Sequence, residues 1–158
     1  MTPVRSVSAG CNCASLREAA RHVSQLYDHH LAAAGLRNTQ FTILAHLKGA
    51  GPVSVNALAE SLGVDRTTLA RNLQPLLRRR LISAGRSPAD ARSKELQLTA
   101  AGLRRFEVGA SAWSGAQAQF EARLGAQKAG ALRELLGSVV GIDFDLPASP
   151  LSEGEQDD

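Results

Sequence analysis

The stretch LAESLGVDRTTLARNLQPLL, residues 58–77, carries two helical patterns separated by a sharp stop. The first pattern ends at Gly63, a residue suited to the left-handed end of a helix, and Asp65 can cap the start of the second. At 100° per residue, Leu73 and Leu76 of the second pattern lie within about 40° of Leu69. The stretch therefore predicts a helix-turn-helix whose second helix buries a leucine stripe.

The opposite face of that second helix is polar, with side chains about 140° to 200° from the leucine stripe. Arginine and glutamine can bond base edges bidentately, and threonine suits a phosphate or a thymine methyl group. Pro75 predicts a bend in the helix without a break. The alternative is a solvated face with no partner. The DNA-contact candidates of this region are Ser54, Arg66, Thr67, Thr68, Arg71, Gln74 and Arg78, while Arg79 is expected to contact phosphate or solvent.

Two helices are expected before this stretch. Apolar residues recur at three- and four-residue steps over residues 14–34, and Gly35 follows where a glycine cap belongs. The next segment has a capping candidate at Asn38 or Thr39, and glycines 49 and 51 are expected to stop it. A short extended run, VSV at residues 53–55, then leads into the helix-turn-helix, with Ser54 as a helix cap.

A β-hairpin is expected after the helix-turn-helix. Leu81 begins one extended arm, and Leu96 and Leu98 alternate on the other. An eleven-residue connection, residues 85–95, joins the two arms.

Two further helices complete the chain. Thr99 can cap a long helix over residues 100–124, and a last helix spans roughly 126–140. The order of elements predicts a mainly α fold with a small β-hairpin wing: a winged helix-turn-helix joined to a helical dimerisation region.

Basic groups are concentrated in the expected winged region. Residues 64–105 hold ten Lys and Arg against three Asp and Glu, a net charge of +7, whereas the whole 158-residue chain has +3. Such a concentration is typical of a nucleic-acid surface, because each neutralised phosphate releases counterions. Residues 142–158 hold six acidic groups and no basic group, so we expect an acidic, disordered tail.

The composition excludes several other classes of protein. Hydrophobic residues make up 44% of the chain, which is enough for a core. The sequence contains no run of eighteen apolar residues, the length needed to cross a bilayer. The N-terminus does not read as a signal peptide, so we expect a cytoplasmic protein without a membrane partner. No HExxH, P-loop, GxSxG or CxxC motif occurs, so we expect no enzyme, no catalytic residue and no cofactor.

The segments GLRNTQFTILAHL, LAESLGVDRTTLARNLQPLLRRRLI and, most specifically, DARSKELQLTAAG resemble the MarR family of winged-helix transcriptional regulators. The resemblance implies a homodimer that grips a pseudo-palindromic operator in double-stranded DNA. It implies that residues about 53–99 bind DNA and that helices about 14–34 and 100–141 form the dimer, within a domain spanning residues 14–141. Residues 1–13 would then be an N-terminal arm.

The resemblance also assigns roles in the wing. It implies that Arg92 enters the minor groove and that Asp90 orients basic groups. Arg80 departs from the family's pattern, because many relatives have glycine before the Leu-Ile strand.

Cys11 and Cys13 leave three interpretations open. A metal site would need further ligands, and the four histidines show no recognised metal spacing, so no metal is expected. The segment CASLREAAR resembles the organic-peroxide-sensing branch of the family, and Cys13 falls at that branch's reactive-cysteine position. The tyrosine-rich stretch of that branch is NTQF here. The third interpretation is two reduced cysteines near a dimer interface.

His22, His29 and His30 lie on or beside the first expected helix. The resemblance implies a nearby pocket for a small aromatic or phenolic effector, and these side chains are its candidate lining. Interfacial or solvent-facing histidines are the alternative.

Three functional hypotheses follow. The first is a dimeric, sequence-specific DNA-binding repressor that a small ligand or an oxidant releases from its operator. The second is a thiol-based organic peroxide sensor of the same fold. The third is a helical interaction module whose winged lobe binds protein instead of DNA.

Overall fold

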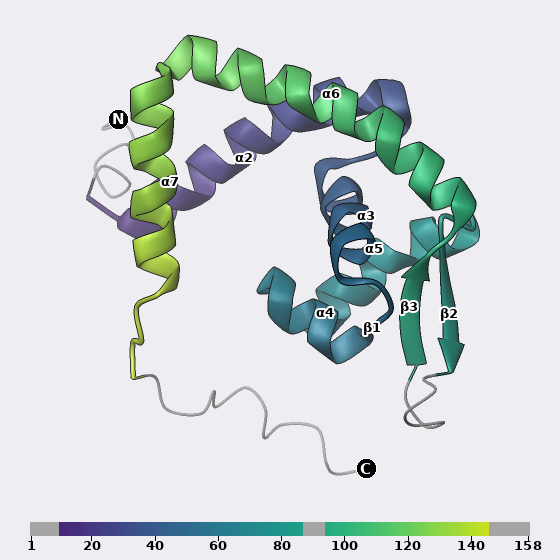
Figure 1. Cartoon of the computed structure of the whole chain (residues 1–158). Helices are drawn as coiled ribbons and strands as arrows, with labels where there is room; N and C mark the ends of the chain where they lie inside the picture. Colours follow the sequence, from purple (N-terminus) through teal and green to yellow (C-terminus); the bar gives the residue numbers. More distant parts are fainter. Residues whose placement is uncertain (1–9, 87–93, 146–158) are drawn as a thin grey trace, which may run out of the picture. The chain divides into compact units, whose positions relative to one another are not determined.

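The computed structural model describes residues 10–86 and 94–145, and within them the fold is mainly α with a small sheet, as expected (Figure 1). No helix in these two ranges is long and apolar enough to cross a membrane. The elements in chain order are α2 (Asn12–Leu31), the 3-10 turn η1 (Ala32–Ala34), α3 (Asn38–Ala50), β1 (Val53–Ser54), α4 (Val55–Leu62), α5 (Arg66–Arg78), β2 (Ile82–Arg86), β3 (Lys94–Leu98), α6 (Ala100–Leu124) and α7 (Ala126–Val140).

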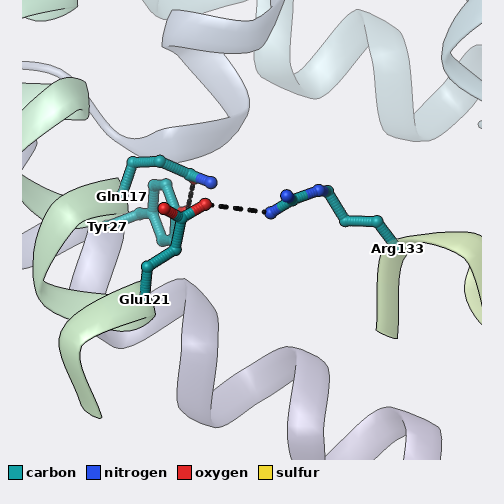
Figure 2. A network of polar contacts seen from close by, with 4 residues as sticks. All are labelled: Tyr27, Gln117, Glu121 and Arg133. Carbon is teal, nitrogen blue, oxygen red and sulfur yellow. Dashed lines mark hydrogen bonds and ion pairs between the residues drawn. The ribbon is translucent and has the colours of Figure 1, made fainter. Parts of the chain in front are cut away.

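The chain separates into two compact units, residues 1–118 and residues 119–158. In the first, the Tyr27 hydroxyl of α2 donates a hydrogen bond to Gln117 Oε1 of α6 (Figure 2). In the second, Arg133 of α7 lies 3.1 Å from Glu121 of α6 in a largely exposed ion pair, a kind that contributes little to stability (Figure 2).

The sheet has three antiparallel strands in the order β1-β3-β2, one more than the expected hairpin. Val53 of β1 pairs with Leu96, and Ile82 of β2 pairs with Leu98. Gly85 pairs with Glu95 and Arg86 pairs with Lys94, so these four residues belong to the hairpin arms and the expected eleven-residue connection was too long.

The hydrophobic core lies in the first unit and joins the helix-turn-helix to α3 and the sheet. Leucine supplies most of it, because a leucine stripe recurs on each helix that meets the centre. The largest fully buried side chains are Leu31, Ile43, Leu44, Leu47, Leu58, Leu69, Leu76, Ile82 and Leu96.

Two expected helix starts have different outcomes. Thr99 caps α6, since its Oγ1 accepts the Gly102 N–H at 3.0 Å. The expected caps of α3 were wrong: Arg37 precedes the helix, and the Asn38 N–H donates instead to Oδ1 of Asp28 in α2, at 2.6 Å. Sequence spacing could not reveal this cap, because its acceptor comes from another helix.

Three other element boundaries differ slightly from the expectation. Helix α2 begins at Asn12 rather than at residue 14, and its last turn tightens into η1. Gly49 lies inside α3 and does not stop it; the helix ends at Ala50, before Gly51.

Candidate nucleic-acid interface

The turn between α4 and α5 sets the start of α5. Gly63 adopts φ +61°, and the N–H groups of Gly63 and Val64 bond the carbonyls of Glu60 and Ala59 at 3.0 Å each. This is the paired bonding of a Schellman turn, which closes α4 and redirects the chain. The predicted stop at Gly63 is therefore confirmed.

Asp65 caps α5 as predicted. Its Oδ1 accepts the Thr68 N–H at 2.8 Å and its Oδ2 accepts the Thr68 hydroxyl at 2.7 Å. Both bonds favour the ionised carboxylate, so they lower the pKa of Asp65 below its ordinary value of 3.8. Thr68, one of the predicted DNA contacts, is half-buried, and its hydroxyl donates its hydrogen bond to the Asp65 cap.

One face of α5 is anchored in the core. Leu69, Leu73 and Leu76 are buried, and the helix packs against α3, α4 and β2. Pro75 lies inside the helix and does not break it, as expected. The leucine stripe therefore fixes which side of α5 points outward.

The outward side of α5 gathers five of the predicted DNA contacts: Arg66, Thr67, Arg71, Gln74 and Arg78 are all exposed. Within residues 10–86 and 94–145, none of their side chains makes a hydrogen bond or an ion pair. A helix face with this many unused donors, three of them guanidinium groups, is suited to phosphates and base edges.

The neighbouring elements hold the other candidates. Ser54 is half-buried, and its Oγ accepts the Ala57 N–H at 3.1 Å, so the hydroxyl caps α4 as predicted. Arg86 and Lys94 are exposed at the far end of the hairpin, where their backbones pair. Asp90 and Arg92 lie outside the described residues.

The arrangement of these elements has close counterparts among known proteins. A family model described as the MarR family matches residues 34–93. The transcriptional regulator MosR of M. tuberculosis, solved in complex with DNA, is 34% identical, with a TM-score of 0.68 over 84% of this chain and 99% of MosR. The chain belongs to the MarR family. It is therefore a DNA-binding transcriptional regulator, which confirms the expectation of a regulator and not an enzyme.

Other solved structures have a similar fold. A probable transcriptional regulator from Pseudomonas aeruginosa is 28% identical, with a TM-score of 0.75 over 83% of this chain and 98% of its own. PcaV of Streptomyces coelicolor, solved with its natural ligand, is 24% identical, with a TM-score of 0.76 over 89% of this chain and 97% of its own, and supports the fold alone. No curated protein sequence matches the chain.

The two cysteines of this MarR protein lie at the start of α2. Cys11 immediately precedes the helix and Cys13 is its second residue, and both are exposed free thiols. Among the described residues, no group of three or more His, Cys, Asp or Glu side chains is placed to hold a metal.

The three candidate histidines lie along the same helix in different surroundings. His22 lines an open depression on one face of α2, and His29 is exposed. His30 is half-buried beside Gly115 of α6, where a Cβ would lie 3.1 Å from its Nδ1, and its ring meets that of His29 edge-on at 6.0 Å.

Arg79 has a structural role that the sequence did not reveal. Its Nη1 donates to the Gly35 carbonyl at 2.7 Å, and Arg105 Nη1 donates to the neighbouring Ala34 carbonyl at 2.9 Å. Arg79 is exposed, as a phosphate or solvent contact requires, and its side chain also ties the end of α5 to the turn before α3.

A cavity beside α5 was also missed. It measures about 470 Å³ and is lined by Ser24 and Asp28 of α2, the segment 37–40 at the start of α3, and Arg71, Asn72 and Pro75 of α5. The α5 residues Arg71, Asn72 and Pro75 are distant in the chain from the other two segments, so no local spacing could have grouped them.

Proposed function

We propose that this MarR regulator binds a pseudo-palindromic operator as a homodimer, with α5 of each subunit in the major groove. The observation that supports the proposal is the exposed face of α5, where Thr67, Arg71, Gln74 and Arg78 lie opposite a buried leucine stripe and Arg66 is exposed at the first turn. The recognition helices of a two-fold dimer meet half-sites about one helical turn apart, roughly 10 bp centre to centre.

Exposed apolar residues at the C-terminal end support the dimer. Leu135, Leu136, Val139 and Val140 of α7 are 38% to 86% exposed, and Ile142 and Phe144 follow them. A row of this kind indicates a surface that another chain covers.

We further propose that the wing contributes Arg92 to the minor groove, with Asp90 orienting a neighbouring guanidinium by a charge-assisted hydrogen bond. The regulator acts as a repressor, and a small ligand releases it. Relatives of the same fold support this regulation: PcaV is solved with its natural ligand, and the DNA binding of BpsR of Bordetella bronchiseptica is regulated by 6-hydroxynicotinic acid.

A gel-shift titration against the DNA flanking the protein's own gene tests the function. We expect one discrete complex that survives excess random DNA and whose affinity falls steeply with salt. Binding no tighter than to random DNA at any salt concentration would favour the protein-binding module instead.

A thiol-based response is the second candidate, favoured by the exposure of Cys11 and Cys13 at a helix N-terminus. Exposed thiolates oxidise readily to sulfenic acid. Under this proposal an organic hydroperoxide releases the operator and Cys13→Ser resists it. Unchanged operator affinity of the wild type under hydroperoxide would leave the small ligand as the sole signal.

A further inference from the structure

We propose that Arg79 and Arg105 together bind the phosphoryl group of a small molecule, at the place where the end of α5 and the first turns of α6 meet the turn before α3. This pair of side chains is called the arginine clamp below. The inference goes beyond the proposed function, because it requires neither DNA nor a second subunit. It concerns two guanidinium groups that do not belong to the outward face of α5.

The two side chains converge on one turn of the backbone. Arg79 Nη1 donates to the Gly35 carbonyl at 2.7 Å, and Arg105 Nη1 donates to the Ala34 carbonyl at 2.9 Å. A Cβ built on Gly35 would lie 3.4 Å from Nη2 of Arg79 and 3.7 Å from Nη1 of Arg105, so both guanidinium groups reach the same point. Helices α5 and α6 thus bring two positive charges together at the Ala34–Gly35 turn.

These two charges have no acidic counterpart in the part of the chain that the structure describes. Neither arginine forms an ion pair there, although Glu107 is only two residues from Arg105 along the chain. The two carbonyls are neutral acceptors and leave the net charge of the pair unchanged. Arg105 is half-buried, so solvent screens the repulsion between the two guanidinium groups less than it would on an open surface. A bound anion would relieve this repulsion.

The remaining donors favour a tetrahedral oxyanion. A guanidinium carries five N–H donors, and each carbonyl bond uses one of them. A carboxylate has two oxygens, which the fork of a single arginine satisfies. A phosphoryl group presents three oxygens and nearly two negative charges, so it can bond both guanidinium groups at once and balance both charges. The chemistry of the clamp therefore matches a phosphorylated small molecule or inorganic phosphate.

The direction of Arg79 favours a free ligand over the DNA backbone. Arg79 directly follows the last residue of α5, Arg78, and lies about 100° around the helix from it. Arg78 belongs to the outward face of α5, whereas the Arg79 side chain returns to the turn before α3. A DNA phosphate that meets the outward face is therefore not the expected occupant of the clamp.

The first experiment uses the full chain without DNA and inorganic phosphate as the probe. Calorimetry at constant ionic strength measures binding, and acetate serves as the carboxylate comparison. We expect millimolar phosphate to bind at one saturable site per chain and about tenfold more tightly than acetate. The absence of saturable phosphate binding, or equal affinities for the two anions, would overturn the inference.

Substitutions in the clamp locate the bound phosphate. Arg79→Ala and Arg105→Ala should each lower phosphate affinity about tenfold, the usual loss for one charge-assisted hydrogen bond. Arg104→Ala is the matched control, because Arg104 is an exposed neighbour of Arg105 and carries the same charge, and it should keep the wild-type affinity. An equal loss in Arg104→Ala and Arg105→Ala would indicate general attraction to a basic surface and would overturn the clamp.

A conservative variant separates binding from the structural role of the carbonyl bonds. Arg79→Lys keeps the positive charge and a donor for the Gly35 carbonyl but lacks the planar fork. It should therefore stay folded and still bind phosphate several-fold more weakly than the wild type. The rise in melting temperature that phosphate produces is compared with each variant's own value without phosphate. A wild-type response in Arg79→Lys would contradict a clamp built from two guanidinium groups.

A second experiment separates a free phosphoryl compound from the DNA backbone. The salt dependence of operator affinity is measured for the wild type and for Arg105→Ala. We expect the same slope for both proteins, whereas a slope smaller by about one would assign the clamp to a backbone phosphate and overturn the free ligand. Failure of the wild type to bind its operator would contradict the proposed function alone, because phosphate binding is measured without DNA.

Discussion

Arg80 adopts φ +53° in the turn that ends α5. Its N–H bonds the Leu77 carbonyl and the Leu81 N–H bonds the Leu76 carbonyl, at 2.9 Å each, which makes this a Schellman turn. The equivalent turns after η1 and α4 have glycine at this position, Gly35 and Gly63, both with φ +61°. The departure from the family's glycine therefore places a side chain in a left-handed conformation.

Arg80→Gly should stabilise the protein by about 1 kcal/mol, because glycine avoids the Cβ clash of the left-handed region. Arg80→Ala is the control, since it removes the same charge and keeps the clash. Thermal unfolding of the two variants measures the difference. A gain in Arg80→Ala as large as in Arg80→Gly would show that charge, and not conformation, is responsible.

Gly102 marks the closest approach of α6 to the chain before β2. A Cβ at this position would lie 1.9 Å from the Leu81 carbonyl oxygen and 2.8 Å from Leu98 Cδ1. The backbone atom cannot move aside cheaply, so only glycine fits.

Gly102→Ala should destabilise the fold by about 3 kcal/mol, at the upper end of overpacking effects. Gly49→Ala is the matched control, because a Cβ at Gly49 meets nothing within 4 Å. Denaturant unfolding compares the two. Equal stability of both variants would contradict the close approach.

At the scale of the element, the N-terminus of α5 depends on the charge of Asp65. A carboxylate whose pKa is lowered in the folded state stabilises it above the unfolded pKa, near 3.8, and loses that effect as the pH falls through the folded pKa. Asp65→Ala should therefore lower the melting temperature at neutral pH, and its difference from the wild type should shrink below about pH 4.

The Asp65→Asn variant tests the effect of the capping hydrogen bond separately from the effect of the carboxylate charge. Asparagine caps helices about as well as aspartate, so this variant should keep most of the stability and lose the pH dependence. Melting curves from neutral to acidic pH measure both variants. A wild-type advantage over Asp65→Ala that persists unchanged at the lowest pH would contradict this account.

The outward face of α5 predicts a sequence-specific role for Arg71. Arg71→Ala should cost about 2 kcal/mol in binding to the operator and less in binding to random DNA, because base contacts carry specificity and phosphate contacts do not. Arg104→Ala is the control and should leave the ratio of the two affinities unchanged. Arg79 is unsuited to this purpose, since its guanidinium holds the Gly35 carbonyl. Equal losses of Arg71→Ala on both DNAs would mean that Arg71 contacts only phosphate.

For the whole molecule, dimerisation should depend on the apolar residues of α7. Leu135 is 66% exposed, so Leu135→Glu should leave the subunit folded and weaken the dimer, because a charge would have to be buried in the interface. Gln127→Glu adds the same charge on the exposed start of α7 and should have no effect. Light scattering across protein concentrations measures the association. A wild type that stays monomeric at micromolar concentration would contradict the proposed dimer.

The sequence by itself determined the order of elements and the orientation of α5. These features depend on local rules: the leucine spacing selects the buried face, Asp65 and Thr99 cap the helices that follow them, and Gly63 ends a helix. The exposure of Thr67, Arg71, Gln74 and Arg78 follows from the same periodicity.

Only the tertiary structure decided the features that join distant segments. The Asp28 carboxylate that meets the start of α3, the Arg79 and Arg105 bonds to the Ala34–Gly35 turn, and the cavity that contains Arg71 each combine residues from different helices. The physical reason is that a hydrogen bond or a cavity depends on distance in space, whereas spacing along the chain constrains only neighbours on one helix or strand.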